Sequence, residues 1–279
     1  MNRIKIGTMQ GRLVPKFRGQ YQAHPINNWH KEFKIAKKLN LDLIEFIFDY
    51  YKHDLNPIFN KQNCEKIIYQ KKTYSIDVLS VCADYFMISP IHSNFFHKKN
   101  KSLDVLKKLI KNCSRLGVKF IVIPCVDKSS FKNNNEINLF KKNIEKVIPL
   151  LNKQNICLSI ESDLPPKKFL ELVRSFKSNK IKINYDIGNS AFKGYDCEEE
   201  LSKYGKYVSH IHIKDRLFNG PSVKLGTGDA DIKNMLIKLK KIKYKGPFIL
   251  QAYRDKQNIN IFKKQYRYFT KLLKETNWC

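Results

Sequence analysis

In VSHIHIKDR, residues 208–216, polar and apolar side chains alternate in an unusual way, and this alternation is the first indication of the fold. Successive side chains of a β-strand point to opposite faces, so His210, His212 and Lys214 share one face and the two isoleucines share the other. A face that carries two histidines and a lysine is expected to line a site rather than an apolar core. The rest of the chain indicates which face of the strand is the inner one.

Seven other stretches resemble strands, and amphipathic helical segments separate them. The eight strand-like stretches lie at 3–9, 42–48, 76–86, 119–125, 156–163, 181–189, 208–216 and 247–253. The helical segments lie at 30–40, 63–74, 101–116, 136–153, 166–177, 197–207, 231–242 and 262–275. This alternation predicts an α/β protein with a parallel sheet, and the count and length predict a single (β/α)₈ TIM barrel over residues 1–279. A doubly wound open sheet is the alternative, but the chain has no GxGxxG turn.

Composition excludes several other classes of protein. The hydrophobic fraction of 42% is that of a globular chain, and no apolar run approaches the roughly 18 residues of a membrane span. The first residues, MNRIKIGTMQGRL, lack the apolar core and cleavage site of a signal peptide. Seven scattered cysteines without a CxxC motif favour a reducing compartment. We therefore expect a cytoplasmic protein with no membrane partner.

The net charge of +28 raises the question of nucleic-acid binding. Only eight of the 53 basic residues are arginines, and the lysines are spread over almost every helical segment. Specific readers of DNA rely on arginine, whose planar guanidinium binds base edges and phosphates in pairs of hydrogen bonds. The pattern favours a solvated lysine coat over a nucleic-acid interface. Small acidic substrates would still be attracted.

In a TIM barrel the outer face of each strand lies under helices, and the inner face near the carboxyl ends of the strands carries the active site. The isoleucines of 208–216 then face outward and the histidines inward. The same alternation turns one metal-binding side chain inward from each of the last four strands. These four are Glu161, Asp186, His212 and Gln251. Oxygen and imidazole ligands without a thiolate predict one divalent ion, Mn²⁺, Mg²⁺, Co²⁺ or Zn²⁺.

Several motifs together resemble the sugar phosphate isomerase/epimerase family of xylose isomerase-like barrels. They are GTMQGRL (7–13), SVCADYFM (80–87), SIESD (159–163), NYDIGNSAFKG (184–194), HIHIKDR (210–216), LGTGDADI (225–232) and FILQAYRD (248–255). The resemblance implies the same four metal ligands. It also implies a metal-dependent isomerase or epimerase of a small sugar or sugar phosphate.

Gln251 departs from this family, whose epimerases place a glutamate at that position. A glutamine can bind a metal through its carbonyl oxygen, but it cannot carry a proton. Glu161 remains the expected base, with Lys214 and Glu45 as further catalytic candidates. The candidates for substrate binding are Arg216, Asn189, His210 and Asp84.

Some alternatives remain open at this point. The loop GTGDAD, residues 226–231, fits either a phosphate-binding helix start or a tight turn with Asp231 as the helix N-cap. For function, the alternatives are a sugar dehydratase or lyase, an endonuclease IV-like nuclease and a sugar-binding protein without catalysis. The nuclease uses a histidine-rich three-zinc site, whereas Asn189 stands here where a ligand histidine would follow Asp186. A homo-oligomer is compatible with the sequence.

Overall fold

Eight parallel strands close into a barrel. The computed structural model describes residues 4–93, 96–255 and 259–278, so Arg3 and Cys279, used in the counts above, lie outside the described residues. The barrel strands are β1 (Ile6–Met9), β2 (Leu43–Ile47), β3 (Ser80–Cys82), β4 (Phe120–Cys125), β5 (Cys157–Ser162), β6 (Ile181–Asp186), β7 (Val208–Ile213) and β10 (Phe248–Leu250). Each pairs in parallel with its neighbours in the order β1-β10-β7-β6-β5-β4-β3-β2. The predicted (β/α)₈ barrel is confirmed.

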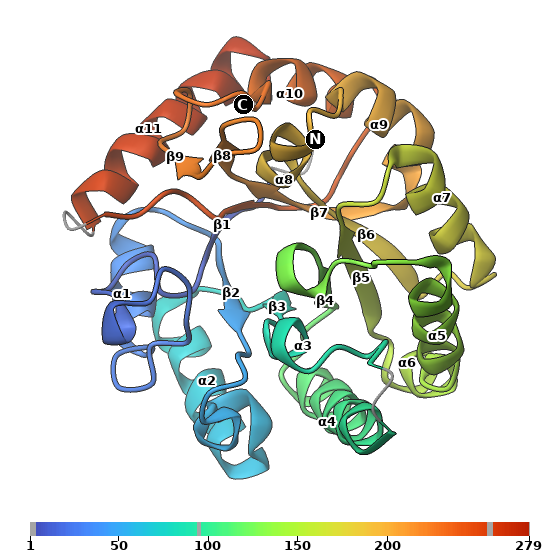
Figure 1. Cartoon of the computed structure of the whole chain (residues 1–279). Helices are drawn as coiled ribbons and strands as arrows, with labels where there is room; N and C mark the ends of the chain where they lie inside the picture. Colours follow the sequence, from blue (N-terminus) through green and yellow to red (C-terminus); the bar gives the residue numbers. More distant parts are fainter. Residues whose placement is uncertain (1–3, 94–95, 256–258, 279) are drawn as a thin grey trace.

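Helices form a ring around the barrel (Figure 1). They are α1 (Lys31–Lys38), α2 (Lys61–Tyr74), α4 (Phe96–Arg115), α5 (Asn134–Glu145), α6 (Ile148–Gln154), α7 (Pro166–Ser175), α9 (Cys197–Tyr204), α10 (Ile232–Lys241) and α11 (Ile259–Glu275). The predicted helix 136–153 is two helices, because Pro149 lies at the start of α6, where its fixed φ and missing N–H are tolerated. Among the described residues, no helix combines the length and apolar character needed to cross a bilayer.

Short elements follow the carboxyl ends of several strands. They are η1 (Phe17–Gly19), η2 (His53–Leu55), η3 (Pro57–Phe59), α3 (Tyr85–Ile88), η4 (Asp127–Ser129), α8 (Ile187–Lys193), β8 (Asp215–Arg216) and β9 (Ser222–Val223), whereas η5 (Gly205–Tyr207) lies between α9 and the start of β7. The predicted strand 208–216 therefore ends at Ile213, and its last two residues pair with β9 in an antiparallel hairpin. The predicted strand 76–86 is shorter too, so Asp84 lies beyond β3.

The inward and outward faces follow the predicted alternation. Ile211 and Ile213 belong to the large apolar cluster between barrel and helices, as do the alternate residues of β5, β6 and β10. A second, smaller apolar cluster forms from side chains of the opposite parity. It comprises Met9, Leu43, Ile47, Cys82, Val122 and Ile249. Polar side chains of the same parity as this inner cluster are therefore turned into the barrel.

Candidate active site

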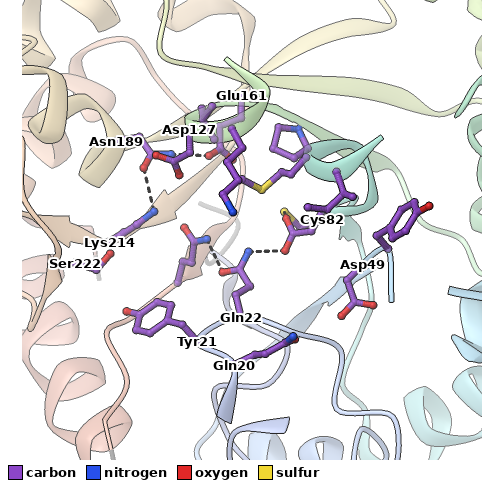
Figure 2. Close-up of a pocket in the computed structure, with 18 of the residues that line it drawn as sticks. Gln20, Tyr21, Gln22, Asp49, Cys82, Asp127, Glu161, Asn189, Lys214 and Ser222 are labelled. Atoms are coloured by element: carbon purple, nitrogen blue, oxygen red, sulfur yellow. Dashed lines mark hydrogen bonds between the residues drawn. The ribbon is translucent and has the colours of Figure 1, made fainter. Parts of the chain in front are cut away.

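A large cavity of about 850 Å³ is lined by residues at and beyond the carboxyl ends of the barrel strands. Its walls include six of the predicted site residues, Asp84, Glu161, Asn189, Lys214, Arg216 and Gln251. Figure 2 shows labelled side chains from different strands and loops pointing into this space. The location at the carboxyl ends of the strands is where TIM barrels place their active sites.

Three of the predicted metal ligands lie together, and we call Glu161, Asp186 and His212 the rim triad. One potential ligand atom from each lies within 4.8 Å of the other two, and all three side chains are buried. His212 Nδ1 lies 3.4 Å from Glu161 Oε2 and 3.9 Å from Asp186 Oδ2. Two carboxylates and one imidazole in this arrangement suit a divalent ion such as Mn²⁺ or Zn²⁺.

Neighbouring amides hold the two carboxylates of the rim triad. Glu161 accepts a hydrogen bond of 2.7 Å on each oxygen, from Asn184 Nδ2 and from Asn189 Nδ2. Asp186 caps α8 by accepting from the Asn189 backbone N–H at 2.9 Å. A side-chain oxygen at a helix N-cap satisfies an otherwise free N–H group. The start of α8 therefore fixes the rotamer of Asp186 at the end of β6.

Two cations converge on the side-chain oxygen of Asn189. Lys214 Nζ and Arg216 Nη1 both donate to Asn189 Oδ1 at 3.0 Å, so Asn189 Nδ2 is the atom that faces Glu161. Lys214 also lies 3.4 Å from Asp186 Oδ2, and it packs so closely over Gly188 that any Cβ at that position would collide with it. The two cations place positive charge in the cavity wall, where an anionic substrate oxygen would be attracted.

A second cluster lies on the other side of His212, and we call Glu45, His210 and His212 the deep triad. His212 Nε2 lies 2.7 Å from Glu45 Oε1, and His210 Nε2 lies 3.2 Å from Glu45 Oε2. All three side chains are wholly buried, and neither Glu45 nor His210 lines the cavity. Two residues that we predicted to act on the substrate, Glu45 and His210, thus contact His212 and each other.

Two carboxylates, Glu45 of the deep triad and Glu161 of the rim triad, set the pKa of His212. Burial by itself would lower the pKa of His212, but Glu45 and Glu161 raise it to about 10. Burial would likewise raise the pKa of Glu45, yet the two histidines hold it well below its ordinary value. Because Glu45 accepts from Nε2, the Nδ1 atom is the one turned toward the rim triad.

Gln251 lies at the same rim, directly after β10, and its amide is oriented by Gln22 from the loop between β1 and α1. Gln251 Nε2 donates to Gln22 Oε1 at 2.9 Å. Gln251 Oε1 is buried and has no hydrogen-bond partner. A buried carbonyl oxygen without a partner is rare in proteins. Such an oxygen is free to bind a ligand, and the expected role of Gln251 as a fourth metal ligand stays a prediction.

Asp84 faces the cavity from the segment between β3 and α3. It accepts hydrogen bonds from Gln22 Nε2 at 2.7 Å and from Cys82 Sγ at 3.2 Å. Burial, and to a smaller extent the nearby charges of Glu161 and Asp49, raise the pKa of Asp84 to about 6. This carboxyl group can therefore exchange a proton close to neutral pH.

The sequence left two alternatives open for the loop 226–231, a tight turn or a phosphate site. The structure shows the turn. The backbone N–H groups of Gly226, Gly228 and Ala230 donate to the Asp215 carboxylate at 2.8, 3.0 and 3.1 Å. Asp231 caps α10 by accepting from the Asn234 N–H. Since a carboxylate already occupies the amides that would bind a phosphate, the loop has a structural role.

Sequence reasoning missed the loop between β1 and α1, residues 10–30. Arg12 Nε donates to the Ala252 carbonyl at 2.9 Å, and Arg254 Nη2 donates to the Val14 carbonyl at 3.0 Å. Both arginines are buried, and they tie this loop to the segment after β10. The signal was present in the sequence, since Arg12 and Arg254 are two of only eight arginines in a lysine-rich chain.

Comparison with known proteins agrees with this geometry. The model of the xylose isomerase-like TIM barrel family matches residues 33–272, and the chain belongs to that family. A putative L-ribulose-5-phosphate 3-epimerase SgbU from Haemophilus influenzae is 27% identical over 254 residues, which cover 84% of this chain and 87% of the relative. The expectation of an enzyme of the sugar isomerase/epimerase class agrees with this relative.

Two solved structures share the fold over nearly their whole lengths. A xylose isomerase domain protein from Planctomyces limnophilus superposes with a TM-score of 0.79 at 17% identity, covering all of both chains. The IOLI protein, solved with a bound zinc atom, superposes with a TM-score of 0.76 at 15% identity, covering 98% of each chain. At these identities the likeness establishes the fold.

Proposed function

We propose that this protein is a metal-dependent epimerase or isomerase of a small sugar or sugar phosphate. The observation that carries the proposal is the rim triad, whose ligand atoms converge within 4.8 Å beside a cavity of about 850 Å³. Gln251, whose Oε1 is buried and unpartnered, is the proposed fourth ligand. The similar H. influenzae protein, named as a putative sugar phosphate epimerase, supports the substrate class.

The residues present fit one divalent ion, Mn²⁺, Mg²⁺, Co²⁺ or Zn²⁺. Glu161, Asp186 and His212 offer charged oxygens and an imidazole nitrogen, and Gln251 offers a neutral carbonyl oxygen. The solved barrel with a bound zinc atom shows that a protein of this fold can hold such an ion. When bound, the ion supplies Lewis-acid chemistry that polarises a substrate carbonyl and acidifies the neighbouring C–H bond.

Glu161 is the proposed base that removes the proton from this carbon. Its two oxygens are held by Asn184 and Asn189, so the carboxylate is oriented before the substrate arrives. Asn189 and Arg216 are proposed to bind substrate oxygens, and Lys214 to stabilise negative charge that develops there. These three side chains already interact at the cavity wall.

A second proton carrier is required, because Gln251 cannot serve as one. Asp84 lines the cavity with a pKa of about 6, close to the operating pH that general acid–base catalysis favours. We assign this role to Asp84. Glu45 and His210 lie outside the cavity wall, so we assign them the positioning of His212 in place of direct catalysis.

The proposed compartment is the cytosol. All six cysteines among the described residues are free, as expected where thiols are kept reduced.

Metal analysis tests the proposal directly. The purified chain should bind about one Mn²⁺, and the double variant His212→Ala/Asp186→Ala should bind none, because two of the three rim-triad ligands are lost. The matched control is His30→Ala/Asp54→Ala, which removes an exposed residue of each kind and should bind as before. The metal-loaded chain should then be screened with ketoses and their phosphates for deuterium uptake from D₂O. A crystal structure grown with excess Mn²⁺ and showing no ion at the rim triad would overturn the proposal.

A further inference from the structure

The surroundings of Gln22 allow only one assignment of the oxygen and nitrogen of its side-chain amide. Arg12 Nη2 lies 3.0 Å from one end of this amide, and a guanidinium group can only donate. That end must therefore be the oxygen. The other end lies 2.7 Å from the Asp84 carboxylate and is the donating nitrogen.

The orientation of the Gln22 amide in turn determines which end of the Gln251 amide is the oxygen. The atom of Gln251 that lies 2.9 Å from Gln22 Oε1 must be a donor, and is therefore Nε2. The oxygen of Gln251 is left without a partner in a buried position. Figure 2 shows Gln22 reaching into the cavity with hydrogen bonds at both ends of its amide. A single chain of contacts thus runs from Arg12 through Gln22 to Gln251.

We propose that Gln22 is a positioning residue, which presents the carbonyl oxygen of Gln251 to the metal and makes a neutral amide the favoured ligand at that position. The inference rests on the proposed metal-dependent function. It explains the departure from the family pattern, because a glutamate at position 251 would direct a carboxylate oxygen at Gln22 Oε1. Arg12 and Asp84 prevent Gln22 from turning over to accommodate it.

Metal affinity in a double-mutant cycle tests this pairing. Gln22→Met keeps the size and neutral charge of the side chain but removes its acceptor, and Mn²⁺ affinity should fall about 10–100-fold, as for other residues that orient metal ligands. Gln251→Glu in the unchanged background should give little increase in affinity. The same substitution in the Gln22→Met background should increase affinity by at least about 10-fold, since the opposing oxygen is gone. Gln62→Met, at an exposed glutamine of α2 that does not line the cavity, should leave affinity unchanged.

A second measurement does not depend on metal. In the metal-free chain the side-chain amide protons of Gln251 should exchange slowly with solvent, because Nε2 is bonded to Gln22. Exchange followed by ¹⁵N NMR should be faster in Gln22→Met. It should stay slow in Gln62→Met, and slow exchange in the unchanged chain tests the contact even if Gln22→Met does not fold.

The outcomes separate this inference from the proposed function. Additive effects of Gln22→Met and Gln251→Glu, or an unchanged Mn²⁺ affinity in Gln22→Met, would overturn the positioning role while leaving the metal site intact. Fast exchange of the Gln251 amide in the unchanged chain would also overturn it. Failure of the unchanged chain to bind Mn²⁺ would overturn the proposed function, and with it the metal-directed part of the positioning role.

Discussion

The rim triad and the deep triad share His212 and have the same kinds of side chain, yet they differ in what surrounds them. In the deep triad, Glu45 lies between two histidines, and all three side chains are wholly buried. In the rim triad, Glu161 lines a large cavity, and the unpartnered oxygen of Gln251 lies at the same rim. Carboxylates and histidines alone therefore do not make a reactive site. Glu161 lines the cavity and is therefore accessible to a substrate, whereas Glu45 and His210 lie outside the cavity wall and can only position their neighbours.

The largest effect should come from changing the base of the rim triad. Glu161→Gln removes the proposed proton acceptor, so deuterium uptake from D₂O into a bound ketose should fall by about 10²–10⁴-fold or more. Because the change also weakens a metal ligand, the assay should be run at saturating Mn²⁺, with Mn²⁺ affinity measured in parallel. Uptake at the unchanged rate in metal-loaded Glu161→Gln would exclude Glu161 as the base.

Inward and outward orientation was predictable from the sequence, whereas depth was not. The period of two along a strand placed Glu161 on an inner face, as observed, and Glu45 shares the parity of the inner residues Leu43 and Ile47. The same period could not predict that Glu45 lies beneath His212 whereas Glu161 lies in the cavity wall. How deep a side chain lies in the barrel depends on the register between neighbouring strands. Glu45 pairs with Met9 of β1, and Glu161 pairs with Pro124 of β4. Glu45 was for this reason predicted as a catalytic residue and is now assigned a positioning role.

Contacts between distant loops were also beyond local sequence patterns. Gln22 and Gln251 are 229 positions apart, and no periodicity relates them. The family resemblance drew attention to Gln251 through the glutamate it replaces, but nothing in the sequence identified its partner. Asp215 likewise occupies the amides of the loop 226–231 from outside that loop. The sequence alone therefore could not choose between a turn and a phosphate site.

An intermediate effect should follow from removing the charge of the deep triad. Glu45→Gln can still accept a hydrogen bond from His212 Nε2 but no longer supplies a negative charge. Mn²⁺ affinity should fall by about 10–100-fold, the usual cost of losing a residue that orients a metal-binding histidine. Calorimetric titration measures this, with the exposed Glu65→Gln as the matched control. If Glu45→Gln binds Mn²⁺ as tightly as the unchanged chain, the deep triad has no part in positioning the ligand.

A third buried carboxylate, Glu32, extends this comparison, because no histidine is among the groups found to shift its pKa. Glu32 Oε1 accepts from the backbone N–H groups of Gly11 and Leu13 at 2.8 and 3.1 Å, and Oε2 has no partner. Burial raises the pKa of Glu32 from 4.5 to about 7, although these hydrogen bonds and two arginines oppose the shift. The pKa of Glu45 is shifted in the opposite direction, because the effect of its two histidines outweighs the effect of burial.

The last predicted effect concerns stability alone, with no change in metal binding or activity, and is the dependence of stability on the charge of Glu32. Because its pKa in the folded protein lies above the ordinary value, the folded chain holds a proton that the unfolded chain has released between about pH 4.5 and 7. Stability supplied by this proton is complete below pH 4.5 and is lost as the pH rises through 7, at a cost of up to about 3 kcal/mol. Glu32→Gln cannot ionise, so its free energy of unfolding should fall less between pH 5 and pH 8 than that of the unchanged chain. Denaturant titrations at the two pH values, with exposed Glu65→Gln as the control, measure the difference. If the stability of Glu32→Gln and that of the unchanged chain depend equally on pH, Glu32 ionises as readily in the folded protein as in the unfolded one. Burial without a histidine would then not raise the pKa of Glu32, and the contrast with Glu45 would fail.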